Sequence, residues 1–263
     1  MSIINPLASS NAAGAGNTGS TGTSASQATG GTAAVSHLLS KADQRIQADV
    51  DSTKAQLSAF GRLKSAVSGG QIAAQALTAL GPGASASTIT KTTADFFNAF
   101  NATIQTAQST AAIPGSTQAA QSANRVVRDM KWALSSGGVT GDAMRKLGFK
   151  LQADGSLSHD PQTFGAALSK DPAGLRAALA SLGKQVSGIA SKELAVGGSV
   201  ATGLASLTQH SGALTAQQQA MLKMEKALAG GVSSANASSV GGASTTGNYA
   251  GQGLAAYWAN LNG

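Results

Sequence analysis

A seven-residue repeat of apolar side chains constrains the fold of this chain more than any other feature. One heptad position carries Leu39, Ile46, Thr53, Phe60 and Val67, and the position four residues later carries Asp43, Val50, Leu57 and Lys64. These are the d and a positions of a coiled-coil seam. Thr53, Asp43 and Lys64 weaken the seam, so an amphipathic helix packed on its own domain is the alternative interpretation. Both interpretations predict one long helix, which we expect over residues 38–80.

A second apolar stripe of the same kind lies near the other end of the chain. It consists of Leu214, Met221, Met224 and Leu228. Residues 215–218 carry a helix-start signal, so we expect a C-terminal coiled-coil helix over residues 214–229. Two matched seams at opposite ends of a chain suggest that the two helices pair with each other.

Composition supports a mainly α fold. Alanine accounts for 53 of the 263 residues, whereas Leu, Ile, Val and Phe together number 48. A chain so poor in large apolar residues is not expected to build a large mixed core. With 11% charged residues it is also too weakly charged to be disordered throughout. We therefore expect disorder to be local.

The charges mark where order begins and ends, because all of them lie in residues 41–226. The first flank consists mostly of Ala, Gly, Ser and Thr, and ordering such a segment gains too little burial to offset its entropy. We expect a disordered export-type tail over residues 1–37 and a flexible tail over 230–263. The start of the chain has no basic n-region and no long apolar stretch, so we expect export without a Sec signal peptide.

Between the two seams, the pattern predicts a helical domain over residues 88–213. Helices are expected over 92–112 and 118–134, separated by a stop-and-cap segment at 113–116. Alternating apolar and polar residues around Asp154-Gly155 predict a β-hairpin over 147–158. Asp160-Pro161 and Asp171-Pro172 each place an N-cap residue before a helix-starting proline, so two more helices should begin there.

Motifs that suggest chemistry lack the context that the chemistry needs. Residues 14–19 match the G-x-G-x-x-G dinucleotide fingerprint, but no strand precedes them and no helix start follows. Ser158, His159 and Asp160 are adjacent, and adjacent side chains cannot form the relay of a catalytic triad. We therefore expect no nucleotide cofactor and no triad.

Metal-binding and hydrolytic patterns are also missing from the sequence. The chain has no cysteine, and its three histidines, His37, His159 and His210, are far apart. Glu193 and Glu225 are the two glutamates, and no pair of carboxylates has the pattern of a hydrolase. The sequence predicts a non-enzymatic protein without a metal or other cofactor.

The basic excess leaves a second function class open. The chain carries a formal charge of +7, and six basic residues gather in one region: Arg125, Arg128, Lys131, Arg145, Lys146 and Lys150. Such a cluster can bind phosphates, but spacing by three along a helix is also typical of a solvated face. The pattern favours the solvated face, and a nucleic-acid-binding protein remains the alternative. An unrelated secreted helical translocator or adhesin is a third interpretation.

Three stretches resemble the flagellar filament cap family, hook-associated protein 2. The first runs from Lys41 to Val67 and the second is Asp95-Phe96-Phe97-Asn98-Ala99-Phe100-Asn101. The third runs from Leu147-Gly148-Phe149 through Asp154-Gly155-Ser156-Leu157 and Asp160, then Phe164, Leu168 and Asp171-Pro172. Together they cover roughly residues 38–229. The β-rich head domains that the family usually carries have no room between Val67 and Thr92.

The resemblance implies a structural protein of the bacterial flagellum, located outside the cell at the filament tip or at the hook–filament region. Its terminal helices would pair into a coiled coil and several copies would assemble, with no bond made or broken. The implied partners are further copies of the chain, flagellin or hook–filament junction proteins, and an export chaperone, with no membrane. The implied assembly residues are the two seams: Leu39, Ile46, Val50, Leu57, Phe60 and Val67 with Leu214, Met221, Met224 and Leu228.

Overall fold

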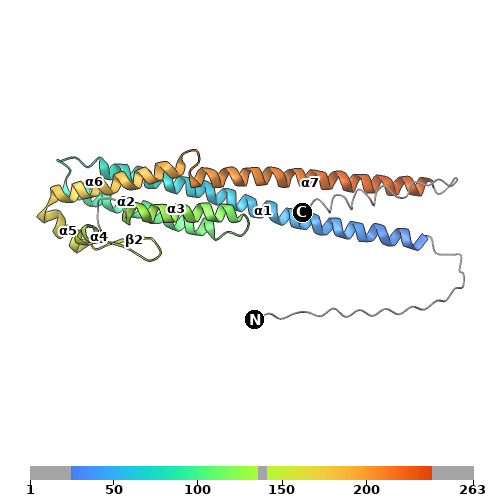
Figure 1. The fold of residues 1–263 in the computed structure, drawn as a ribbon, viewed down its shortest axis with the longest axis horizontal. Coiled ribbons are helices and arrows are strands. Elements are labelled where there is room, and N and C mark those ends of the chain that lie inside the picture. Colours follow the sequence, from blue (N-terminus) through green and yellow to red (C-terminus); the bar gives the residue numbers. More distant parts are fainter. Residues whose placement is uncertain (1–24, 136–140, 239–263) are drawn as a thin grey trace, which may run out of the picture. The chain divides into compact units, whose positions relative to one another are not determined.

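The structure, a computed structural model, describes residues 25–135 and 141–238, and the fold is mainly α (Figure 1). The helices are α1 (Ala25–Thr78), α2 (Ala86–Ala111), α3 (Thr117–Ser135), α4 (Gly141–Lys146), α5 (Pro161–Lys170), α6 (Pro172–Leu194) and α7 (Ser199–Ser238). The strands are β1 (Phe149–Leu151) and β2 (Leu157–His159).

The chain divides into two units, residues 1–42 and 43–263, and the boundary falls inside α1. The described part of the first unit is a single helical segment, residues 25–42. The second unit holds the rest of α1 and all the other helices and strands.

Within the second unit, α1 runs antiparallel to α6 and α7. The side chain of Gln71 on α1 donates a hydrogen bond to the Ser191 hydroxyl on α6 at 2.9 Å. Farther toward the start of α1, Phe60 lies against Gly203, and Gln47 accepts a hydrogen bond from Gln218 at 3.2 Å. As the residue number on α1 decreases, the number of its contacting residue on α6 and α7 increases, so the helices are antiparallel. Figure 1 shows α7 beside the part of α1 that starts at residue 43.

Helices α2 and α3 complete the core of this unit. The Thr103 hydroxyl on α2 donates to the carbonyl of Ala66 on α1, and the Ser206 hydroxyl on α7 donates to Gln118 on α3. The largest fully buried side chains come from four helices and one strand: Phe60, Leu63, Leu77, Ile89, Phe96, Phe100, Ile104, Met130, Phe149, Leu175, Leu179 and Leu182. Burial of such side chains is the main source of stability in a folded domain.

The buried face of α1 keeps a seven-residue repeat, with Thr53, Phe60, Val67 and Ala74 at one position and Gln56, Leu63 and Leu77 at the other. Leu63 is fully buried, whereas Lys64, which the heptad places in the seam, is exposed. The second position of the seam therefore lies one residue before the predicted Leu57 and Lys64. The prediction of one long helix is confirmed.

Three predicted boundaries were wrong. Helix α1 begins at Ala25, so residues 25–37 are helical instead of a tail, and α7 continues to Ser238 instead of ending at residue 229. Extending an existing helix through Ala-rich sequence needs no new nucleus, which explains both extensions. Helix α7 also runs through residues 214–218 without a start, because the Thr215 hydroxyl donates to the carbonyl of Ser211 one turn back instead of capping. The expected tails at 1–24 and 239–263 lie outside the described residues.

The central elements agree with the sequence patterns. Helix α2 starts earlier than residue 92 because Ser85 caps it by accepting from the Thr88 N–H at 3.1 Å. The hairpin is antiparallel with Phe149 opposite His159 and Leu151 opposite Leu157. Asp160 and Asp171 are the N-caps of α5 and α6, each followed by proline in the first turn.

Candidate functional site

Two regions hold the residues that the sequence singled out: the paired terminal helices and the hairpin. In the first region the predicted residues are all at least half-buried. Leu39 lies in the first unit and is buried; in the second unit Phe60, Val67, Leu214 and Met221 are buried, and Ile46, Val50, Leu57, Met224 and Leu228 are half-buried. Phe60 and Val67 belong to the main core, so only the ends of the two helices remain as a distinct seam.

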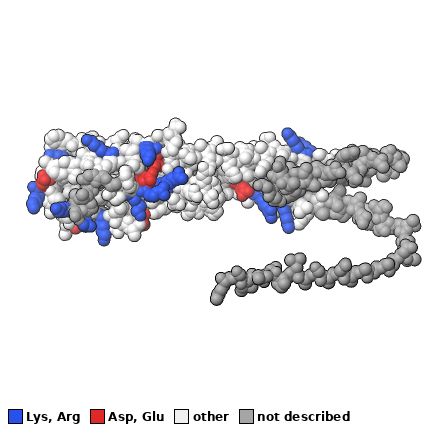
Figure 2. Space-filling view, viewed as in Figure 1, with Lys and Arg blue, Asp and Glu red and all other residues white. Residues whose placement is uncertain are grey.

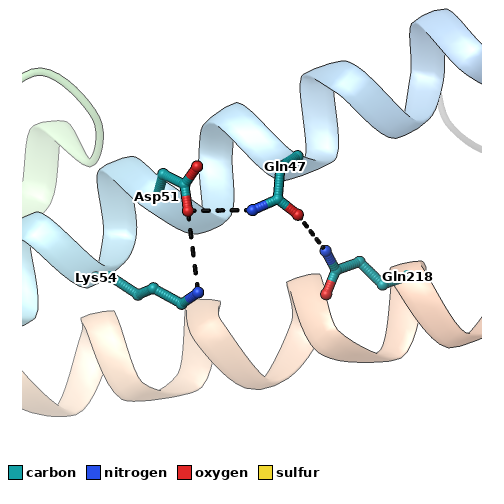
Figure 3. A network of polar contacts seen from close by, with 4 residues as sticks. All are labelled: Gln47, Asp51, Lys54 and Gln218. Carbon is teal, nitrogen blue, oxygen red and sulfur yellow. Dashed lines mark hydrogen bonds and ion pairs between the residues drawn. The ribbon is translucent and has the colours of Figure 1, made fainter.

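Polar side chains join α1 and α7 along the edge of this seam (Figure 3). Gln47 donates to the Asp51 carboxylate at 3.1 Å while its carbonyl oxygen accepts from the Gln218 amide. Lys54 lies 3.9 Å from the same carboxylate of Asp51, with both side chains largely exposed. Exposed contacts of this kind add little stability, so the apolar seam residues must supply most of the pairing energy.

A charge placed in the seam tests the pairing. Ile46→Asp should lower the free energy of unfolding by about 1–2 kcal/mol, because a carboxylate would be half-buried among apolar groups without a partner. Ala48→Asp is the control, since Ala48 is exposed and its replacement loses more intrinsic helix propensity. Urea titration followed by circular dichroism measures both. Equal losses in the two variants would contradict the pairing.

Two side chains of α2 hydrogen-bond the hairpin: Gln108 donates to the Asp154 carbonyl at 2.7 Å, and Asn101 pairs with β2. The Asn101 carbonyl oxygen accepts from the Leu157 N–H at 2.7 Å, and its amide donates to the Leu157 carbonyl at 2.9 Å. An amide side chain can pair in this way with one exposed backbone unit at a strand edge because it carries both a donor and an acceptor. Asn101 therefore satisfies the backbone N–H and carbonyl of Leu157 at the edge of β2, as a neighbouring strand would.

Aromatic rings fill the space between the hairpin and α2. Phe97 meets Phe149 edge to face at 4.8 Å between ring centroids, and Phe164 of α5 stacks on Phe149 at 5.8 Å. Phe97 also stacks with the His159 ring at 5.2 Å. The family-motif positions Phe96, Phe97, Phe100, Phe149 and Leu157 are buried, and Asn101, Leu147 and Leu168 are half-buried. The second and third resemblance stretches are therefore in direct contact.

The turn of the hairpin is built by Asp154 and Gly155. One carboxylate oxygen of Asp154 accepts from both the N–H and the hydroxyl of Ser156, and these bonds, the hydroxyl first, hold the pKa of Asp154 below its ordinary value. Gly155 has a φ of 93°, which glycine adopts without strain. A side chain there would also lie 2.9 Å from the Lys131 Cδ. Lys131 itself donates to the Ala153 carbonyl at 3.2 Å.

The two Asp-Pro motifs serve as helix starts. Asp160 accepts from the Gln162 N–H at 3.0 Å and from the Thr163 hydroxyl at 2.6 Å. The Thr163 hydroxyl, followed by the Gln162 N–H, lowers the pKa of Asp160. Asp171 accepts from the Gly174 N–H at 2.8 Å, while its neighbour Pro172 opens α6. Both carboxylates accept hydrogen bonds from backbone N–H groups of the first helical turn, as the side chains of N-cap residues usually do.

No catalytic arrangement forms from the sequence candidates that the structure describes. Ser158 accepts from the Gln152 amide, His159 stacks on Phe97 and Asp160 caps α5, so the three do not form a relay. The described residues contain no group of three or more metal-ligating side chains. The G-x-G-x-x-G segment at 14–19 and the aromatic residues Tyr249, Tyr257 and Trp258 lie outside the described ranges.

The structure also brings together one carboxylate pair that no sequence pattern predicted. Glu193 near the end of α6 is 1% exposed and has Asp129 of α3 as its neighbour. Burial, together with a hydrogen bond to Asp129 and repulsion by its charge, raises the pKa of Glu193. The two residues are 64 positions apart in the sequence (193 minus 129), so no local motif could reveal them.

The basic cluster is partly neutralised and partly used within the fold. Arg128 lies 3.8 Å from the Asp129 carboxylate, and Lys131 is bonded to the hairpin turn. On the face drawn in Figure 2, basic side chains are separated by uncharged surface and accompanied by acidic ones. This face carries no continuous basic stripe of the kind that follows a phosphate backbone.

Sequence reasoning missed several residues that position these regions. Gln56 is buried on α1 and holds the loop between α2 and α3, accepting from the Ser116 N–H at 3.1 Å and donating to the Ile113 carbonyl at 3.3 Å. Gly183 and Gly203 allow α6 and α7 to approach α1 closely. A glutamine or glycine inside an otherwise apolar helix face was the only available signal, and it is a weak one.

Comparison of the chain with protein-family models, with curated proteins and with solved structures finds no match. Among the described residues, none of the helices combines the length and the apolar character that crossing a membrane requires.

Proposed function

We propose that this protein is a non-enzymatic structural component of the bacterial flagellum, similar to hook-associated and filament-cap proteins and assembled through its terminal helices. One observation carries the proposal. Two of the stretches that resemble the cap family lie about fifty residues apart in sequence, yet Asn101 of one bonds both backbone groups of Leu157 in the other. A chance likeness of short motifs gives no reason for such a contact, whereas a shared fold does.

The terminal helices support the same proposal from a second side. Helices from the two ends of the chain pair antiparallel, as the Gln47–Gln218 contact and the packing of Phe60 on Gly203 require. Toward the ends of this pair, the seam residues Ile46, Val50, Met224 and Leu228 are only half-buried. Leu222 on α7 is 56% exposed. Partly buried apolar residues on a two-helix stem are well suited to a further helix from another copy.

In this role the protein would bind copies of itself and flagellin or hook–filament junction proteins, and an export chaperone would hold it before secretion. It would need no cofactor, because its role in the filament would be structural and no reaction would be catalysed. The connection between α1 and α2, residues 79–85, is too short for the cap family's head domains, so we place the protein at the tip or at the hook–filament region without assigning it the plate of a cap.

Self-association is the expected solution behaviour. Sedimentation velocity at tens of micromolar protein should show oligomers, or an average mass that rises with concentration, because a second copy would cover the half-buried seam. The oligomers should persist when nucleic acid is absent and when salt is raised. A mass that stays at one chain over this range would remove the support for assembly.

A second measurement separates the flagellar proposal from the nucleic-acid alternative. Sheared and washed flagellar filaments from the source bacterium should contain the protein by mass spectrometry. Binding to duplex DNA near physiological salt should be weak, since the face drawn in Figure 2 carries no continuous basic stripe. Absence from the filaments, combined with tight and steeply salt-dependent DNA binding, would favour the alternative.

A further inference from the structure

The connection between α6 and α7 is a tight turn built on two glycines. Helix α6 ends at Leu194 and α7 begins at Ser199. Gly197 has a φ of 86°, and a side chain on Gly198 would lie 2.2 Å from the Lys192 carbonyl oxygen and 2.4 Å from that of Glu193. Because these are backbone atoms, they cannot move aside. The turn is therefore fixed against the last residues of α6, where Glu193 lies.

One buried carboxyl joins the three helices that meet at this turn. Glu193 belongs to α6, and its Oε2 accepts from the N–H of Ser199, the first residue of α7, at 3.1 Å. Asp129 of α3 is its hydrogen-bonding neighbour. The first N–H groups of a helix lack partners within the helix, so Glu193 supplies an acceptor that α7 would otherwise lack.

We propose that Glu193, beside Asp129, forms an acid-dependent latch that fastens the start of α7 to α3 and α6 when Glu193 is protonated, and loosens when Glu193 is charged. The latch does not depend on the flagellar proposal. It acts on the helix that carries the seam residues Leu214 to Leu228, so it sets how firmly that helix is anchored at its first turn.

The two states differ by one proton. In the closed state the protonated oxygen of Glu193 donates to the Asp129 carboxylate, while the other oxygen accepts from the Ser199 N–H. Loss of this proton leaves two negative carboxylates side by side, one of them buried, and both burial and repulsion oppose that state. The pair can relieve the repulsion by separating, which pulls the start of α7 away from α3.

The charged groups around the pair do not remove this conflict. On α3, Arg128 lies 3.8 Å from the Asp129 carboxylate, but its side chain is 69% exposed and therefore screened by water. On α6, Lys192 is exposed. On α1, the stretch between the Gln71 and Phe60 contacts carries Arg62 and Lys64, which are both exposed. The described part of α7 nearest the turn, residues 199–209, has no charged side chain.

The direction of the pH effect follows from the pKa of Glu193, which burial and Asp129 raise. The protonated group favours the folded state fully below the ordinary glutamate range, and this contribution is lost as pH rises through the raised pKa. Asp154 and Asp160 act in the opposite direction, because their lowered pKa values give stability that is lost only in stronger acid. Histidine side chains ordinarily titrate between about pH 5 and about pH 8, so the latch is isolated by comparing the wild type with Glu193→Gln over this range.

Hydrogen exchange of the full chain measures the latch directly. After correction for the intrinsic effect of pH, the protection of amides in residues 196–203 should fall several-fold from about pH 5 to about pH 8. Amides in the middle of α2 should change much less. In Glu193→Gln the protection should stay high at both pH values, because the amide oxygen still accepts from Ser199 and the amide nitrogen donates to Asp129.

Two further variants make the outcome decisive. Asp129→Asn removes the second charge and should also keep the turn protected at both pH values. Glu225→Gln, at the exposed glutamate of α7, should keep the wild-type pH response. The latch is overturned if wild-type protection at residues 196–203 does not depend on pH, or if Glu193→Gln and Asp129→Asn both keep the wild-type response.

Discussion

Replacing Gly183 with alanine should lower the free energy of unfolding by about 2–4 kcal/mol. A Cβ at this buried position on α6 would lie 2.4 Å from the backbone carbonyl oxygen of Ala74 and 3.0 Å from the Leu77 Cβ. A backbone carbonyl inside α1 cannot rotate away, so α6 must shift from α1 or the core must distort. Overpacking of this kind outweighs the helix propensity that alanine gains over glycine. Urea-induced unfolding followed by circular dichroism gives the value.

Gly188 provides the matched control, because it lies on the same helix and an added Cβ would have no neighbour within 4 Å. Gly188→Ala should raise stability by roughly 0.5–1 kcal/mol, since only the propensity effect remains. Opposite signs for the two substitutions would establish that α6 packs closely on α1 at residue 183. A stabilising effect of Gly183→Ala would contradict the arrangement of these two helices.

The features that the sequence revealed are the local ones. The Asp-Pro helix starts, the Asp154-Gly155 turn and the stop at residues 113–116 all act through neighbours within a few positions, so residue types at fixed spacing were enough to identify them. The long helix over the first seam was also predictable, because an apolar period over several turns is a property of one segment. The boundaries at residues 25, 199 and 238 were missed, since the Ala, Gly and Ser content there does not mark where helix extension stops.

The close helix contacts could not be predicted, because they depend on pairs of residues far apart in the chain. Gly203 allows Phe60 to fit, and a side chain there would lie 2.2 Å from an atom of the Phe60 ring. Nothing in the residues around Gly203 distinguishes it from Gly212, which has no neighbour within 4 Å of an added Cβ. The same holds for Glu193 and Asp129, whose meeting is a consequence of packing three helices together.

In the candidate site, too, local motifs were predictable from the sequence and contacts between distant residues were not. The sequence identified Asn101 and Leu157 as parts of two separate family-like stretches, but not that one side chain binds the other's backbone. Hydrogen bonding between a side chain and a strand edge is a tertiary contact with no spacing rule. Sequence patterns therefore identified the two residues, and the structure showed that the Asn101 side chain hydrogen-bonds the Leu157 backbone.

Asn101→Ala should separate the hairpin from α2 and lower the free energy of unfolding by about 2–4 kcal/mol. The substitution removes the bond of 2.7 Å from the Leu157 N–H and the bond of 2.9 Å to the Leu157 carbonyl. Leu157 is 4% exposed, so its backbone groups have little access to water in place of the lost partner. Phe149 and Phe97 should lose part of their packing as the hairpin moves.

Asn98 gives the control within the same sequence motif, because it lies one turn earlier on α2 and is exposed. Asn98→Ala should change stability by less than about 0.5 kcal/mol, or raise it slightly through better helix propensity. Hydrogen exchange at Leu157 adds a local readout, which should lose protection in Asn101→Ala and keep it in Asn98→Ala. If Asn101→Ala leaves both the stability and the Leu157 amide unchanged, the hairpin is held by its other contacts, which include the aromatic rings and the bonds from Lys131 and Gln108. The contact that carries the proposed relation to the cap family would then have no energetic role.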